Sequence, residues 1–149
     1  MLAYGPGRSK RPLDLGATAA LVAGALLVLW SSYIHFHLWD ETGGYRHIPT
    51  IGPLFLLQSI GGLLLGLLIL AVRRLWAAVL GLGFAVSTMV GFLISVQWGL
   101  FGFNESWAAP YAHQAFFIEV AAIVAFGVAG ALCLAGARVP AGAATATLA

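Results

Sequence analysis

Four long apolar runs fill most of this 149-residue sequence, and Glu119 is the one Asp, Glu, Lys or Arg within them. Each run reaches the length of about 20 residues that an α-helix needs to cross roughly 30 Å of hydrocarbon. Within a bilayer only helices and closed barrels pair all their backbone hydrogen-bonding groups, and runs of this length favour helices. The sequence therefore predicts an all-α integral membrane four-helix bundle, with spans at about 15–38, 51–72, 75–98 and 111–135.

The composition excludes a water-exposed globular domain. Hydrophobic residues make up 61% of the chain and charged residues 8%, with a mean hydropathy of +0.96, whereas soluble domains are roughly 25% charged. The length allows one domain, which we place at 13–136 between a flexible tail at 1–12 and a disordered tail at 137–149. A cleaved signal peptide is the alternative interpretation of the first run, but that apolar run is too long for one.

Lys and Arg are distributed unequally between the two ends of the predicted spans. In multi-pass proteins the short loops that are rich in these residues face the cytoplasm. The sequence therefore predicts an antiparallel, up-down topology with both termini cytoplasmic. One side carries Arg8, Lys10, Arg11, Arg73, Arg74 and Arg138, and the other carries Arg46 alone.

Small residues recur at a spacing of four on every predicted span. Such residues let helix backbones approach closely, and in lipid this close packing holds helices together. We expect these positions to lie at helix contacts, within the bundle or between copies of it. They are Gly16, Ala20 and Gly24; Gly62 and Gly66; Ser87, Gly91 and Ser95; and Ala121, Ala125 and Ala129.

Polar side chains within the spans concentrate in the half nearer the predicted outer surface, and Glu119 is the acidic residue among them. It lies roughly 12 Å into the fourth span, at 1.5 Å per residue. A polar group in lipid costs free energy unless it has a partner. We expect a cluster of Glu119, His35, Gln58 and Ser31, with His35 as the first partner of Glu119 and Gln58 as the neutral alternative. Glu119 is then either a proton- or ligand-binding carboxyl or a structural one.

The predicted outer loops offer a second set of polar residues, Asp40, Arg46, His47 and His113. We expect Arg46 to lie near Asp40 or Glu41, and these loops to recognise a lipid headgroup or a partner protein. His35 and His113 are the hypothesis for a haem or metal site, although they lack the close spacing of strong helical metal motifs. No cofactor is predicted.

The segment HFHLWDETGGYRHIPTIGPLFLLQ, from His35 to Gln58, resembles small, uncharacterised four-span proteins of high-GC actinobacteria. In size and number of spans the chain is also similar to the DoxX-type family. The resemblance implies a plasma-membrane location in a Gram-positive cell, and it supplies no substrate, cofactor or catalytic residue.

The sequence leaves three functions open. No nucleophile elbow, phosphate loop or dinucleotide fingerprint is present, so an enzyme is not predicted. The basic residues do not gather on one face with aromatic residues, which argues against nucleic acid as a partner. The first hypothesis is a non-catalytic accessory or scaffold subunit that binds a partner membrane protein or a second copy of itself. The second is a small-ligand-binding or proton-linked transport module using Glu119, and the third is the haem or metal protein using His35 and His113.

Overall fold

The computed structural model describes residues 12–42 and 44–138 of the chain. Almost all of these residues are helical, and the four longest helices are long and apolar enough to cross a membrane. The prediction of an all-α protein with four apolar spans is thereby confirmed. The elements are α1 (Pro12–His37), a π-helical turn η1 (Leu38–Thr42), a short 3₁₀-helix η2 (Tyr45–His47), α2 (Ile51–Val72), α3 (Leu75–Trp98) and α4 (Ala112–Arg138).

The first and last helices each extend a few residues beyond the predicted spans, α1 at its start and α4 at its end. α1 begins at Pro12, a residue suited to a first helical turn because the N–H that it lacks would have no partner there. α4 begins at Ala112 and continues to Arg138. The predicted tails are 1–12 and 137–149. Residues 1–11, which carry the basic residues of the first tail, and residues 139–149 lie outside the described residues.

A two-residue turn joins α2 to α3. Arg73 adopts a left-handed conformation (φ 48°), and its N–H donates to the Ile69 carbonyl. Its side-chain Nε donates to the Leu70 carbonyl at 2.9 Å, so that Arg73 pairs two of the carbonyl groups that a helix end otherwise leaves free. α3 then begins at Leu75.

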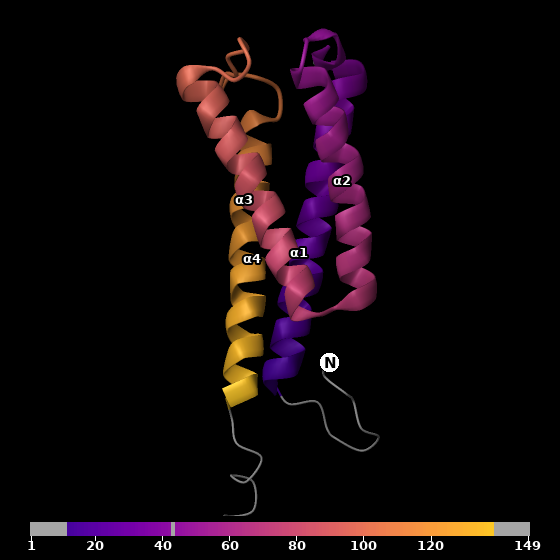
Figure 1. The fold of residues 1–149 in the computed structure, drawn as a ribbon, viewed down its shortest axis with the longest axis vertical. Helices are drawn as coiled ribbons and strands as arrows, with labels where there is room; N and C mark the ends of the chain where they lie inside the picture. Colours follow the sequence, from indigo (N-terminus) through magenta and orange to yellow (C-terminus); the bar gives the residue numbers. More distant parts are fainter. Residues whose placement is uncertain (1–11, 43, 139–149) are drawn as a thin grey trace, which may run out of the picture.

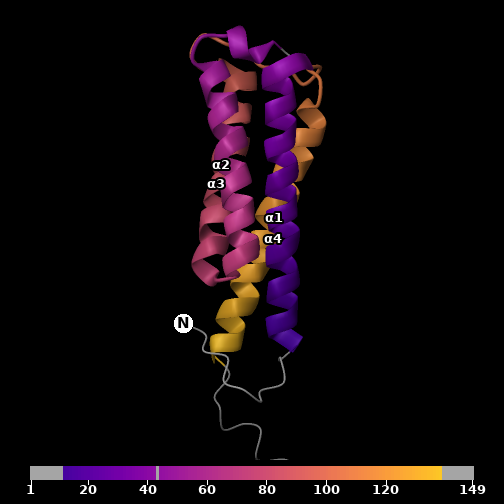
Figure 2. The ribbon, with the colours of Figure 1, turned by 90° about the vertical axis from the view of Figure 1, so that its right-hand side faces the viewer.

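The helices form an elongated bundle in which the α1–α2 and α3–α4 connections lie together (Figures 1 and 2). We call this the loop end; it consists of residues 38–50 and 99–111. Contacts are extensive between α1 and α4, α1 and α2, and α3 and α4, but sparse between α2 and α3. α2 and α3 diverge from their turn toward the loop end (Figure 1).

Close packing is concentrated in the half of the bundle farther from the loop end, around the buried ring of Phe126. An added Cβ would come within 2.6 Å of this ring from Gly24 and within 2.5 Å from Gly81. The ring therefore lies between two helix backbones that approach it closely because both residues lack a side chain. The core here consists of Leu21, Ala25, Val28, Ile69, Ala77, Ala78, Ala85, Ala122, Phe126 and Ala129.

Some of the predicted small-residue positions lie at contacts within the bundle, and others do not. Gly62 and Gly66 do pack closely against side chains of α1. Ser87 and Ala121, in contrast, are exposed, and the space where a Gly91 Cβ would lie is open. Small residues occur on several faces of these helices, so that a spacing of four does not by itself identify the face buried within the bundle.

Large apolar side chains cover the outside of the bundle. Leu57, Leu64, Val79 and Phe117 are each more than 60% exposed. A helix that is hydrophobic both inside and outside the bundle is typical of membrane spans. The outward faces are therefore suited to lipid.

Candidate functional site

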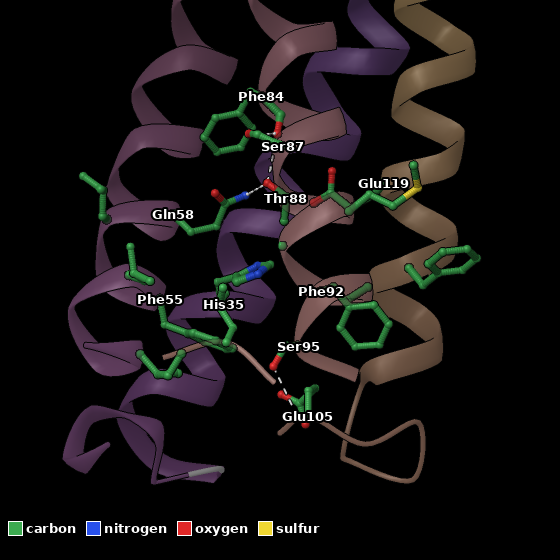
Figure 3. A pocket seen from close by; sticks show the side chains of 18 of the residues that line it. His35, Phe55, Gln58, Phe84, Ser87, Thr88, Phe92, Ser95, Glu105 and Glu119 are labelled. Carbon is green, nitrogen blue, oxygen red and sulfur yellow. Dashed lines mark hydrogen bonds between the residues drawn. The ribbon is translucent and has the colours of Figure 1, made fainter. Parts of the chain in front are cut away.

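A cavity of about 500 Å³ lies in the half of the bundle nearer the loop end, where α2 and α3 diverge (Figure 3). The lining is mostly apolar and includes Gly91, which has open space beside it, and the exposed Ser87. Five phenylalanines contribute to it, namely Phe55, Phe84, Phe92, Phe103 and Phe116.

Three polar side chains form a hydrogen-bonded chain at the wall made by α1 and α4. The Ser31 hydroxyl donates to Oε1 of Glu119 at 2.5 Å. Nδ1 of His35 lies 2.9 Å from the Ser31 carbonyl oxygen and 3.4 Å from the Ser31 hydroxyl. Because a carbonyl oxygen only accepts, Nδ1 must carry the proton, and Nε2 of a neutral imidazole then has a free lone pair.

The structure brings Glu119, Ser31 and His35 together but changes their predicted order. Ser31, rather than His35, is the direct hydrogen-bond partner of Glu119. Ser31 lies between the other two because it is one helical turn from His35 on α1 and faces α4.

The second carboxyl oxygen of Glu119, Oε2, is buried and has no hydrogen-bond partner among the described residues. The Glu119 side chain is 2% exposed and lines the cavity. Buried polar atoms are nearly always paired, because an unpaired one costs about 1–3 kcal/mol. Oε2 therefore offers a hydrogen-bonding position that this part of the chain itself does not fill.

Gln58 crosses the cavity to α3 instead of joining Glu119. Its Nε2 donates to the Thr88 hydroxyl at 2.5 Å, and Thr88 in turn donates to the Phe84 carbonyl at 3.0 Å. This contact is one of the few that connect α2 to α3 (Figure 3).

Residues of the two connections cover the cavity at the loop end, and we call Tyr45, Phe103 and Glu105 the cap. Tyr45 stacks on Phe55 with 4.4 Å between ring centroids and meets Phe103 edge-on at 5.7 Å. Its hydroxyl donates to Oε2 of Glu105 at 2.8 Å. Burial raises the pKa of the Tyr45 phenol, and Glu105 raises it further, so the phenol remains a donor at neutral pH.

Glycine at position 52 allows the cap to lie against α2. A Cβ added there would lie 2.7 Å from the Arg46 carbonyl oxygen and 2.8 Å from that of Tyr45. Glu105 is held from its other side, since its Oε1 accepts from the Ser106 N–H at 2.9 Å. Both connections are thus fixed over the cavity.

The predicted loop residues do not form one group. Arg46 pairs with Asp40 at 3.5 Å, as expected, and its Nε donates to His47 at 3.1 Å. Such an exposed pair adds about 0–1 kcal/mol to stability. His113 is exposed and packs beside Trp107, with 5.4 Å between ring centroids.

The haem or metal hypothesis required His35 and His113 to act together. His35 lines the cavity and His113 does not. Within residues 12–42 and 44–138, no three His, Cys, Asp or Glu side chains are grouped as metal ligands would be.

The three linked polar side chains are not arranged as a hydrolase triad. In a hydrolase triad the histidine lies between the nucleophile and the acid, whereas here the serine lies between His35 and Glu119. The cavity instead combines an apolar volume with a few polar atoms at one wall, which is the usual composition of a small-molecule site.

Sequence analysis did not assign Thr88, Tyr45 or Glu105 to a site. Phe84 and Thr88 are four residues apart, so the sequence does place them on one helix face. Tyr45 and Glu105 are 60 residues apart, and no local pattern connects them.

Comparisons with protein-family models, with curated proteins and with solved structures gave no match.

Proposed function

We propose that this protein is a multi-pass plasma-membrane protein that binds a small lipid-soluble molecule in the cavity between α2 and α3. This proposal rests on Oε2 of Glu119, a residue that lines the cavity, because Oε2 has no hydrogen-bond partner in the described part of the chain. It favours the ligand-binding interpretation of Glu119 over the purely structural one, because a structural carboxyl would have both oxygens paired by the protein.

In the proposed topology the four helices are antiparallel, with both termini cytoplasmic and the loop end outside. The distribution of Lys and Arg supports this orientation: Arg73 and Arg74 lie at the α2–α3 turn, and Arg46 is the one Lys or Arg of the loop end. The cavity then lies beneath the outer surface.

The ligand enters from the bilayer rather than from water. The cap covers the cavity at the loop end, and α2 and α3 separate laterally below it (Figure 1). Leu57 both lines the cavity and is 66% exposed on the lipid-facing side. The wall at this point is therefore open to lipid-soluble molecules.

The packing of the other half favours binding over transport through the bundle. Phe126 and the small residues around it leave that half closely packed. A path through the bundle would require these helices to separate.

The scaffold hypothesis ranks second. The linked Asp40, Arg46 and His47 side chains at the loop end are the observation that favours it, since they offer polar contacts to a partner membrane protein or a second copy. An internal cavity has no part in that function.

Substitutions at two glycines of α3 test the binding function. Gly91→Leu places a side chain in the cavity, whereas Gly83→Leu, on the same helix, places one in open space outside the cavity lining. The full chain in lipid nanodiscs is titrated with phenylbutanol, phenylbutylamine and phenylbutyrate, which share a ring and linker. Partitioning into lipid is the same for all variants and cancels in the comparison.

We expect at least one probe to raise the Tm of the wild type and of Gly83→Leu, and to leave the Tm of Gly91→Leu unchanged. Without probe, Gly91→Leu should be more stable than Gly83→Leu by about 0.5–2 kcal/mol, as in other cavity-filling substitutions. If no probe distinguishes the two variants, the binding function is wrong.

A further inference from the structure

Within the part of the chain that the structure describes, the charges that face the cavity are all of one sign. Two carboxyl groups, Glu105 and Glu119, are among the described lining residues, and no Lys or Arg is. Arg46, Arg73 and Arg74 lie in the connections, away from the lining. The lining residues of α2 and α3 carry no ionisable group, and His35 is the remaining titratable one.

The two carboxyl groups have different surroundings. Glu105 accepts hydrogen bonds from the Tyr45 hydroxyl and from the Ser106 N–H, one at each oxygen. Glu119 accepts one, from Ser31, and no described residue is a partner of its Oε2. Both oxygens of Glu105 therefore already accept hydrogen bonds from the protein, whereas Oε2 of Glu119 can still form a hydrogen bond with a ligand.

The atoms at this wall that remain free to form hydrogen bonds favour a hydrogen-bond donor on the ligand. With its proton on Nδ1, a neutral His35 presents a lone pair at Nε2, and Glu119, when a bound cation lets it ionise, presents lone pairs only. An anionic ligand would face two carboxyl groups without a compensating positive charge. A donor group completes the hydrogen bonding of Oε2.

A cationic hydrogen-bond donor compensates the carboxylate charge of Glu119, which a neutral donor cannot do. A buried carboxylate without a counter-charge is strongly unfavourable, and removing the partner of a buried pair costs about 3–5 kcal/mol. None of the described Lys or Arg residues lines the cavity with Glu119, so the ligand would supply the positive charge. The faces of aromatic rings also attract cations, and five phenylalanines line the same space.

We propose that the ligand of this cavity is a lipophilic cation, an amine or ammonium group attached to an apolar or aromatic body. The charged nitrogen pairs with Oε2 of Glu119, and the apolar body occupies the space among the phenylalanine rings. This proposal rests on the binding function proposed above and specifies the chemical class of its ligand.

The three phenylbutyl probes separate charge from shape, because they differ only in the terminal group. In the wild-type chain in nanodiscs we expect phenylbutylamine to bind about tenfold more tightly than phenylbutanol, since a charge-assisted hydrogen bond is roughly twice as strong as a neutral one. Phenylbutyrate should bind most weakly. This comparison requires no substitution and is independent of any variant's folding.

Glu119→Gln tests the named partner. The amide retains an oxygen for the Ser31 hydroxyl but removes the negative charge. We expect affinity for phenylbutylamine to fall about tenfold and affinity for phenylbutanol to change by less than about threefold. Asp40→Asn, which removes a carboxylate outside the cavity lining, is the matched control, and phenylbutylamine affinity should change by less than about threefold there as well.

The outcomes distinguish this inference from the binding function beneath it. If phenylbutanol or phenylbutyrate binds as tightly as phenylbutylamine, and Gly91→Leu abolishes that binding, the cavity binds ligands but the cation inference is wrong. The same conclusion follows if Glu119→Gln leaves phenylbutylamine affinity unchanged. If Gly91→Leu does not weaken the binding of any probe, both proposals fail.

Discussion

Phe126→Ala is expected to lower the free energy of unfolding by about 3 kcal/mol, the largest effect of any single truncation in this bundle. Buried Phe→Ala changes typically cost about 3–5 kcal/mol. The low end applies because unfolded helices of a membrane protein remain in lipid, so that lost packing rather than transfer to water dominates. The ring is 1% exposed, and Gly24 and Gly81 enclose it on two sides.

Phe117→Ala, nine residues earlier on α4, is the matched control. Its side chain is 64% exposed and faces outward, so its truncation should change stability by less than about 0.5 kcal/mol. Reversible unfolding in mixed micelles measures both variants. Equal losses would show that the half of the bundle around Phe126 is not its packed core.

Cysteine labelling should give an all-or-none result for topology. In a Cys133→Ala background, cysteines at Thr42 and Ser106 should react with an impermeant thiol reagent added to intact cells, and a cysteine at Ser9 should react only after lysis. The physical reason is the unequal distribution of Lys and Arg, which holds the α2–α3 turn inside.

The control for that experiment is a permeant thiol reagent, which should label all three positions in intact cells. Labelling of Ser9→Cys from outside would reverse the proposed orientation. The cavity would then lie beneath the cytoplasmic surface, and its ligand would enter from the inner leaflet.

The number and bounds of the spans could be predicted because lipid acts on continuous runs of sequence. A helix in hydrocarbon must be apolar for about 20 residues, and this requirement leaves little freedom in α2 or α3, whose observed bounds match the prediction. The grouping of Ser31, His35 and Glu119 could also be predicted, because their helical spacing and similar distance from the loop end place them at about the same depth in the bundle.

The cavity itself could not be predicted. It exists because α2 and α3 diverge, and that divergence depends on which small residues meet and which do not. Gly81 packs against Phe126, whereas Gly91, ten residues later on the same helix, faces open space. Both are glycines in an apolar helix, and nothing local distinguishes them.

The cap could not be predicted from the sequence for a different reason. The hydrogen bond from Tyr45 to Glu105 joins residues 60 positions apart. It depends on the left-handed conformation of Gly44 and on the contact that Gly52 permits. Loop geometry of this kind leaves no periodic pattern in a sequence.

The site of binding is measured most directly by photo-crosslinking with a phenylbutylamine that carries an azide on its ring. Mass spectrometry of the labelled full chain in nanodiscs should place adducts on cavity-lining residues such as Met89 and Phe116, and Gly91→Leu should remove them. Adducts confined to lipid-facing residues such as Leu64 and Val79, and unchanged in Gly91→Leu, would contradict a ligand site between α2 and α3.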